Sequence, residues 1–152
     1  MAFSAQISLS VLAHETSATD LSSSLRVTPA SYAQTLTNGT AGNQAQLAWS
    51  ATKTLSGASQ TFSLATLSDV RDGATVTVTL TAVKLYYVRN KGASSLAFAG
   101  APFPASGLTV AAGAVAVQSD PSATGMSASG VTVTGTNGGS YDIVLLGNGS
   151  VS

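Results

Sequence analysis

The chain has 152 residues, of which 44% are hydrophobic and only 8% are charged, against about 25% charged residues in a typical domain. Its six basic and six acidic residues give a net charge of zero, so it lacks the surplus of basic groups with which proteins neutralise phosphates, and we expect no nucleic-acid partner. The sequence contains no cysteine, which excludes disulfides and thiolate metal sites.

The N-terminal region predicts strands. Phe3, Ala5, Ile7, Leu9 and Val11 alternate with polar residues, the pattern of a strand with one apolar face. A second extended region covers residues 24–36, where Pro29 predicts an edge strand or two short strands because proline donates no ladder hydrogen bond. We expect residues 1–36 to form either an arm or part of the main domain, residues 37–152.

The same N-terminal segment predicts no targeting or membrane role. It has no basic stretch at its start and no continuous apolar run, so we expect no signal peptide, no transmembrane span and no membrane partner.

The longest strand-like run is TVTVTLTAVKLYYV, residues 75–88. Its period-2 alternation slips by one residue at Val83, which predicts a β-bulge or bend near Ala82 and Val83, or burial of the second half on both faces. Residues 68–73, SDVRDG, read as a loop that leads into this strand.

The C-terminal half predicts short strands joined by turns. Residues 96–99 form one strand, and two hairpins are expected: 108–111 with 114–118, and 131–134 with 141–146. Sustained 3.6-residue periodicity is missing, so we expect little helix. Eight to ten short strands predict an all-β fold, a single antiparallel β-sandwich of jelly-roll type, with an immunoglobulin-like sandwich as the alternative.

Candidate chemical sites are few. His14, the single histidine, has no neighbouring nucleophile-elbow serine, and we interpret it as structural rather than catalytic. Asp69 and Asp72 are weak candidates for a cation site, but the fixed oxygen ligands and terminal glutamate of a calcium loop do not follow them. We therefore expect no catalytic residue, no cofactor and no enzyme.

Contact residues are easier to nominate. Most of the larger aromatic residues are expected in the core: Trp49, Tyr86, Tyr87, Phe98 and Tyr141. Phe103 lies between Pro102 and Pro104 and is expected to present an exposed ring to a partner. Phe3, Ile7, Leu9 and Val11 are expected to contact a partner by adding their strand to its sheet edge.

Two motifs stand out between residues 38 and 147: a G-x-x-x-N-Q-A turn, residues 39–45, and a Y-D-I-V sequence, residues 141–144. With the segments between them, these motifs resemble small all-β proteins encoded among the virion-structure genes of tailed bacteriophages. The resemblance implies a virion component. The inert, charge-poor β-body agrees with a capsid decoration (cement) protein on the outer head surface, bound to the major capsid protein and to itself as a homotrimer. The alternative is a tail or fibre component or a receptor-binding module. A degradative enzyme of the virion would need an acid–base pair or a metal site, and the sequence offers no convincing residues for either.

Overall fold

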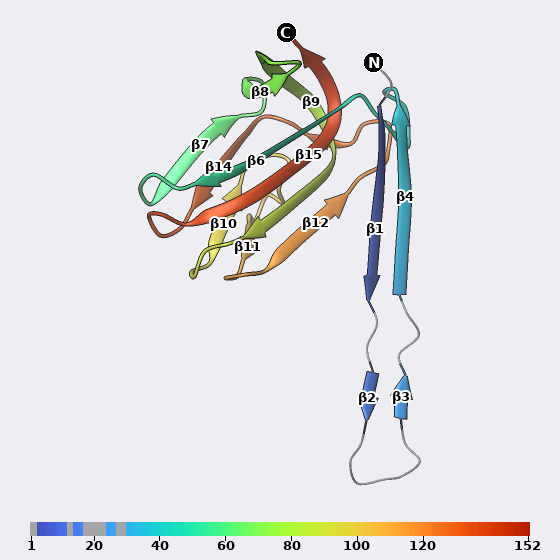
Figure 1. Ribbon diagram of the computed structural model, residues 1–152, viewed down its shortest axis with the longest axis vertical. Coiled ribbons are helices and arrows are strands. Elements are labelled where there is room, and N and C mark those ends of the chain that lie inside the picture. The colour runs from blue at the N-terminus through green and yellow to red at the C-terminus, as the bar shows by residue number, and fades with distance from the viewer. Residues whose placement is uncertain (1–2, 12–13, 17–23, 27–29) are drawn as a thin grey trace.

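The computed structural model describes residues 3–11, 14–16, 24–26 and 30–152, and over these residues the chain is all-β, without helix. Its N-terminal part forms a long projecting hairpin and its remainder forms two facing sheets (Figure 1). We call β1 to β4 the arm and β6 to β15 the body. The arm strands are β1 (Ser4–Val11), β2 (His14–Thr16), β3 (Ser24–Arg26) and β4 (Ala30–Asn38), and β5 (Gln44–Ala45) pairs in parallel with the end of β4.

The body consists of two antiparallel sheets. A six-stranded sheet has the order β12–β9–β15–β6, with β8 and β13 also paired to β9, and a four-stranded sheet has the order β11–β10–β14–β7. The strands of the first are β6 (Leu47–Thr54), β8 (Leu67–Arg71), β9 (Ala74–Asn90), β12 (Val115–Ser119), β13 (Met126–Ser127) and β15 (Ser140–Val151). The strands of the second are β7 (Ser59–Ser63), β10 (Leu96–Ala99), β11 (Leu108–Val110) and β14 (Gly130–Thr134).

The main hydrophobic core lies between these two sheets. Side chains from both sheets form one buried cluster, because alternate residues of each strand point to the same face. Phe98 of β10 meets Tyr141 of β15 edge to face, with ring centroids 5.3 Å apart. Trp49 of β6 is 4% exposed, and its indole N–H donates to the carbonyl oxygen of Ser68 at 3.0 Å.

The slip in the pattern of β9 corresponds to bulges, as predicted. The register between β9 and β15 shifts between Leu146 and Gly147 and again between Asn148 and Gly149. Residues 83–86 are also buried on both faces of the sheet. Leu85 points to the outer face, where the arm covers it, whereas Tyr86 points into the core.

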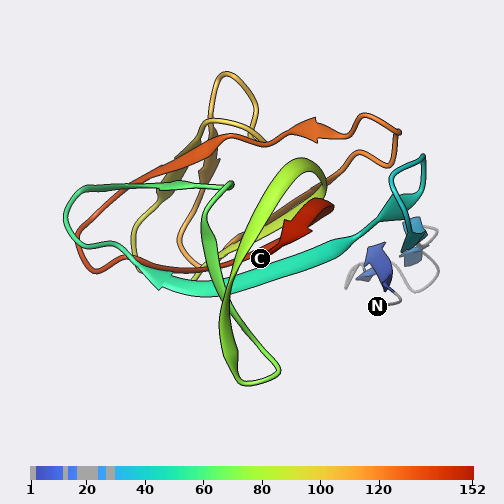
Figure 2. The same cartoon turned by 90° about the horizontal axis from the view of Figure 1, so that it is seen from above.

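The segment before β9 is a strand rather than the predicted loop. β8 and β9 form a hairpin in which Arg71 pairs with Ala74, so that Asp72 and Gly73 alone make the turn. Both turn residues have positive φ, 51° and 81°, which is the geometry of a type I′ turn and matches the Asp-Gly preference of that turn. The hairpin projects from the body (Figure 2).

Both hairpins predicted in the C-terminal half are wrong. β11 and β12 lie in different sheets, and so do β14 and β15. The turns at residues 111–114 and 135–139 therefore carry the chain from one sheet across to the other. Turn residues reveal a reversal of direction, but they do not reveal which strand the next segment will pair with.

The arm strands do not pair with the body sheets: β1 and β4 form a sheet with β5, and β2 and β3 form a second, two-stranded sheet. β1 pairs with β4 along its whole length, from Ser4 opposite Thr37 to Val11 opposite Ala30. The second extended region is two strands, β3 and β4, one of the two predicted outcomes; Pro29 lies outside the described residues. The arm stands beside the six-stranded sheet and extends past the body, with β2 and β3 at its far end (Figure 1).

Candidate functional site

The base of the arm packs on the outer face of the six-stranded sheet. A second buried cluster joins Leu36 and Ala45, both fully buried, to Leu85 of β9 and Leu146 of β15. Phe3, which precedes β1, and Ala5 and Ile7 on the apolar face of β1 lie partly buried against this cluster. The apolar face of β1 is therefore partly buried against its own body.

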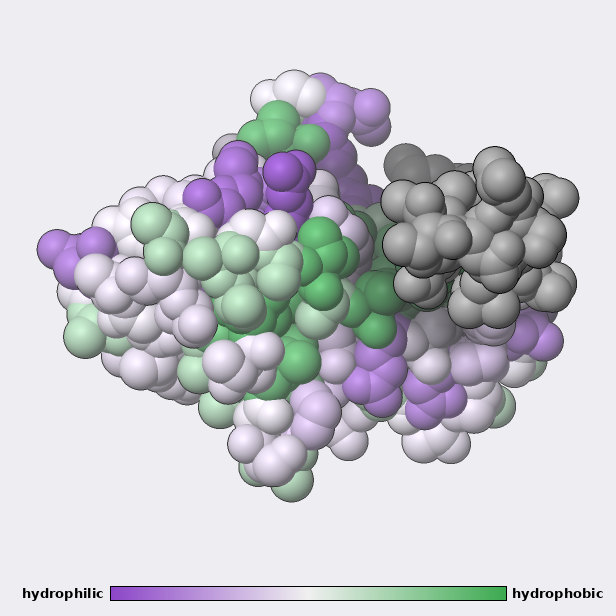
Figure 3. All heavy atoms as spheres, turned by 90° about the horizontal axis from the view of Figure 1, so that it is seen from below, coloured by the Kyte–Doolittle hydropathy of each residue, from purple (hydrophilic) through white to green (hydrophobic). Residues whose placement is uncertain are grey.

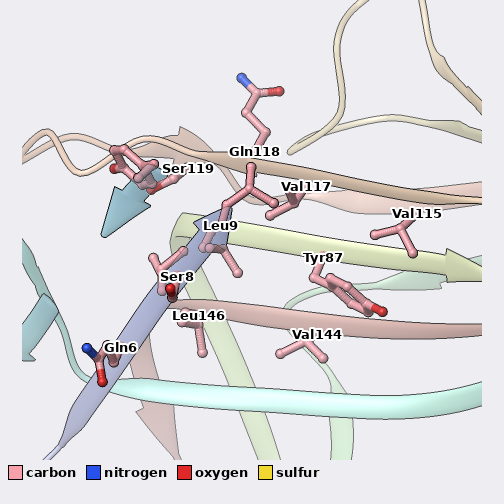
Figure 4. A pocket seen from close by; sticks show the side chains of 13 residues that line it. Gln6, Ser8, Leu9, Tyr87, Val115, Val117, Gln118, Ser119, Val144 and Leu146 are labelled. Carbon is pink, nitrogen blue, oxygen red and sulfur yellow. The ribbon is translucent and has the colours of Figure 1, made fainter. Parts of the chain in front are cut away.

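Beyond this contact, the arm and the sheet enclose an open apolar groove of about 710 Å³. Its floor is the outer face of three adjacent strands, and its wall is the arm (Figure 4). The floor residues are Leu85 and Tyr87 of β9, Val144 and Leu146 of β15, and Val115 and Val117 of β12. The wall residues include Ile7, Leu9 and Tyr32.

The groove is lined by exposed hydrophobic side chains. Leu9 is 50% exposed and Tyr32, opposite it in the register, is 46% exposed; Val115 and Val117 are 52% and 41% exposed. Val11, one step further along the same face of β1, is 57% exposed. Seen from below, hydrophobic residues reach the surface across the middle of the body (Figure 3).

Gln34 is the polar link between arm and body. Its Oε1 accepts hydrogen bonds from the hydroxyl of Tyr32 at 2.5 Å and from Oγ of Ser119, in β12, at 2.9 Å. Its Nε2 donates to Oδ1 of Asn43 at 3.0 Å. These bonds orient Tyr32 at the groove, although nothing in the spacing of the sequence singles out Gln34.

The G-x-x-x-N-Q-A segment forms the connection between arm and body. Asn43 has a positive φ of 57°, and its backbone N–H donates to the carbonyl oxygen of Pro121 at 2.8 Å. Oε1 of Gln44 accepts from the N–H of Ala41 at 2.9 Å, and Ala45 is fully buried in the cluster under the arm. This segment thus fixes where the arm meets the sheet.

Charge is confined to the border of the groove. Among the described lining residues none is acidic or basic. Arg89 of β9 and Asp142 of β15, which pair with each other, lie just beyond the groove residues Tyr87 and Val144 of the same strands. A hydrogen bond from Thr52, with smaller contributions from Lys91 and Arg89, lowers the pKa of Asp142, so this carboxylate stays ionised at neutral pH.

The cation candidates Asp69 and Asp72 both lie in the β8–β9 hairpin, Asp69 within β8 and Asp72 at the turn. Asp69 accepts from its neighbour's backbone, Val70 N–H, at 2.9 Å and pairs with Nε of Arg71 at 3.0 Å. Asp72 occupies the tip of the β8–β9 turn. Throughout the described part of the chain, no three acidic or histidine side chains gather as a metal site requires.

The prediction for Phe103 is wrong, because its ring is buried rather than presented to a partner. Phe103 is only 6% exposed, and its ring centroid lies 4.7 Å from that of Tyr86 and 5.3 Å from that of Phe98. The flanking prolines shape the loop, but the gain from burying an aromatic ring turns Phe103 inward. The other aromatic residues follow the prediction except Tyr87, which is half-buried in the groove.

The nominated strand residues divide into two groups. Phe3 and Ile7 pack against their own body, whereas Leu9 and Val11 remain exposed. Sequence reasoning missed Tyr32, Val115 and Val117, which complete the apolar surface. Their signal is weak because a valine on an edge strand looks the same in sequence whether it faces the core or solvent.

His14 lies in β2, opposite Arg26, on the arm.

The groove offers hydroxyls from Ser8 and Ser119, but no acid or base lies among its described lining residues. The arrangement is suited to binding an apolar surface. No described segment forms a helix of the length and apolar character needed to cross a bilayer.

Comparison with known proteins adds no relative: no family model, no curated protein sequence and no solved structure matches this chain.

Proposed function

We propose that this protein is a non-catalytic structural component of a tailed-phage virion, a decoration (cement) protein that binds the outer surface of the head and stabilises it. The sequence resemblance described above motivates the virion setting. The observation that carries the proposal is the apolar groove with its projecting arm. Exposed apolar patches of this kind mark interaction sites rather than ordinary surface.

We further propose that the body is a jelly-roll sandwich. Counted one to eight in chain order, the eight strands are β6, β7, β9, β10, β11, β12, β14 and β15. Strand one then pairs with strand eight, two with seven, three with six and four with five, all antiparallel. A chain folded in half and then rolled around a core produces these pairs, whereas the immunoglobulin fold divides its strands differently. The strand order therefore supports the jelly roll over the alternative.

A decoration protein works through repetition. Its partners are the major capsid protein and other copies of itself, as homotrimers over the local threefold positions of a head assembled in the host cytoplasm. Contacts that are weak singly become strong together, because binding at one position raises the effective concentration at the next. A rigid body with few charges can be repeated across a lattice without strong repulsion between copies.

Copy number tests this function. Purified virions are separated on a denaturing gel, and the band of this protein is quantified against the major capsid protein. Hundreds of copies per particle, together with earlier genome release on heating of particles that lack the protein, are expected for a decoration protein. A handful of copies indicates a tail or fibre component instead, and absence from intact particles overturns the virion assignment.

A further inference from the structure

A free strand edge borders the groove. β12 pairs with β9 on one side, and no other described strand pairs with its outer edge. Two hydrogen bonds show how the ladder between β12 and β9 is phased. The N–H of Asn90 donates to the carbonyl oxygen of Ala114 at 2.9 Å, just before β12 begins. The N–H of Asp120 donates to the carbonyl oxygen of Lys84 at 2.8 Å, just after β12 ends.

This phase determines which backbone groups of β12 face the free edge. Hydrogen-bonded pairs recur at every second residue of an antiparallel ladder, so the even-numbered residues of β12 direct their N–H and C=O groups to β9. The odd-numbered Val115 and Val117 direct theirs to the outer edge. Their side chains line the groove and are 52% and 41% exposed (Figure 4). One short stretch of β12 therefore offers main-chain hydrogen-bonding groups and an apolar surface together.

The sequence of β12 does nothing to protect this edge. Natural edge strands avoid pairing with other chains by means of charged residues, prolines or bulges. β12 has the sequence VAVQS, without charge or proline, and its register with β9 is continuous from Val115 to Ser119. The edge is therefore suited to accept another strand.

We propose that the edge and the groove bind an extended segment of a different protein, which adds to the six-stranded sheet as a strand beside β12. In strand addition, main-chain hydrogen bonds give affinity and pockets for alternate side chains give specificity. Residues opposite Val115 and Val117 place their side chains in the groove, whose wall includes Leu9 and Tyr32. The segment that fits therefore has two aliphatic residues separated by one residue.

A single strand suits this site better than a folded surface does. A standard interface buries roughly 800 Å² of each partner, more than the few half-exposed side chains of the groove supply. A strand also gains hydrogen bonds from the backbone of Val115 and Val117. The arm stands at one end of the edge, where Ser119 donates to Gln34, so a partner strand lies lengthwise beside β12.

Charge at the other end of the groove specifies the partner further. Arg89 of β9 pairs with Val115, is exposed, and forms no ion pair with any described residue. Asp142, opposite Arg89 in β15, is already held by the hydroxyl of Thr52 at 2.6 Å and by Lys91 at 3.4 Å. An acidic residue two positions beyond the aliphatic pair, on the same face of the partner strand, would meet the charge of Arg89.

This charge argues for a different protein rather than a second copy. β1 and β12, the two edge strands beside the groove, contain no acidic residue, so another copy cannot supply the required segment through either of them. In the setting of the proposed function the segment belongs to the major capsid protein, and in this respect the inference rests on that function.

A synthetic peptide tests the inference without a virion. The probe is the fluorescein-labelled amide STVTVTD, whose two valines and final aspartate share one face of an extended strand. Antiparallel addition places the valines opposite Val117 and Val115 and the aspartate at the end nearer Arg89. Fluorescence anisotropy should show saturable binding, about fivefold tighter than that of STVTVTK. N-methylation of both valines removes the N–H groups directed to β12 and should weaken binding about tenfold.

A proline on the edge separates strand addition from simple apolar contact. Val117→Pro removes an N–H that points away from the sheet, a position at which edge strands tolerate proline, and should weaken binding about tenfold. Val117→Ala keeps that N–H and should lose less. Emission of the single tryptophan, Trp49, reports whether the body remains folded. Arg89→Glu should reverse the preference, so that STVTVTK binds more tightly than STVTVTD.

Thr61→Pro is the matched control. Thr61 lies in β7, the edge strand of the four-stranded sheet, away from the groove. The N–H of Leu64 donates to the carbonyl oxygen of Ser129, so by the same alternation the N–H of Thr61 points outward. Thr61→Pro should therefore bind the peptide as wild type does.

The contrary outcomes are distinct. Equal binding by wild type and Val117→Pro overturns strand addition and assigns the groove to an apolar molecule that does not pair with the edge. A wild-type dimer in light scattering that Val117→Pro converts to monomer assigns the edge to a second copy and overturns the inference. Absence of saturable binding, or equal affinity for the two peptides, overturns the stated chemistry of the partner. Each result uses purified protein, so the virion assignment, tested by copy number, stands or falls separately.

Discussion

Oγ of Ser119 donates a hydrogen bond of 2.9 Å to Oε1 of Gln34, and this bond joins the edge strand of the six-stranded sheet to the arm. The same Oε1 accepts from Tyr32, and Nε2 of Gln34 binds Asn43. One amide thus connects the groove wall, the body and the segment between them. We therefore expect this side chain to help set the direction in which the arm projects.

We expect Gln34→Ala to loosen the arm without unfolding the body. A net loss of about 1 to 2 kcal/mol follows from removing these hydrogen bonds. Hydrogen exchange, followed by mass spectrometry, should become faster in β1 and β4 and stay unchanged in β9 and β15. Thr61→Ala is the matched control, because it removes an exposed hydroxyl pair with Thr132 in the other sheet. Equal exchange in the arm of Gln34→Ala and wild type would contradict the role of Gln34.

The two buried clusters should respond separately to truncation. Leu36→Ala removes a fully buried side chain from the cluster under the arm, and Ile143→Ala removes one from the main core. Each change should cost about 2 to 5 kcal/mol.

Trp49 distinguishes the two effects because it lies in the main core. In Leu36→Ala we expect the arm to become sensitive to protease while tryptophan emission keeps its native wavelength. In Ile143→Ala the tryptophan unfolding midpoint should fall to lower denaturant concentration. A lowered tryptophan midpoint in Leu36→Ala as large as that in Ile143→Ala would show that arm and body unfold as one unit.

The bulges of β9 depend on a glycine in the partner strand. A Cβ at Gly147 would overlap the carbonyl oxygen of Ala82. Because that oxygen belongs to the backbone of the central sheet, we expect Gly147→Ala to lower the free energy of unfolding by about 2 kcal/mol or more. Gly130→Ala is the control, since a Cβ there meets the carbonyl oxygen of Phe62 at 3.6 Å, an ordinary contact. Chemical denaturation of both variants provides the comparison, and similar midpoints would refute the steric argument.

Tyr141 makes the body sensitive to high pH. Burial raises the pKa of Tyr141 to about 12, and its hydroxyl has no hydrogen-bond partner among the described residues. In the unfolded state this hydroxyl ionises near pH 10. The free energy of unfolding is therefore unaffected by Tyr141 below pH 10 and falls as the pH rises from 10 to 12. The loss is on the order of 2 kcal/mol.

Replacing Tyr141 by phenylalanine should remove this pH dependence. At neutral pH we expect Tyr141→Phe to be as stable as wild type or slightly more stable, because it deletes a buried hydroxyl without a partner. Between pH 10 and 12 the variant should lose less stability than wild type. Tyr32→Phe, at an exposed tyrosine, is the control for general alkaline effects, and parallel stability curves for Tyr141→Phe and wild type would count against the argument.

The sequence allowed the all-β class, most strand positions and the bulges of β9 to be predicted, because alternation of side chains reports directly on which face of a strand is buried. The slip at Val83 was informative for this reason. Alternation gave no information on pairing partners. The turns after β11 and β14 look like hairpin turns, but both lead into the opposite sheet.

Only some of the residues that form the groove could be predicted from the sequence. Leu9 and Val11 stood out because their strand alternates cleanly, whereas Val115 and Val117 belong to the groove only because β12 lies at the outer edge of the sheet. Phe103 was misplaced for the opposite reason: two prolines suggested exposure, but long-range packing against Tyr86 and Phe98 decided its position.

The position of β15 between β6 and β9 governs the order in which the protein folds as it is synthesised. β6 and β9 have no direct pairing with each other, so the central sheet cannot assemble until Ser140–Val151 leave the ribosome. The arm strands β1 and β4 pair only with each other and with β5, so their pairing partners are available before the central sheet is complete. We therefore expect a nascent chain to expose the apolar face of β1 until the sheet that shields its base is complete, an interval in which exposed apolar surface favours aggregation.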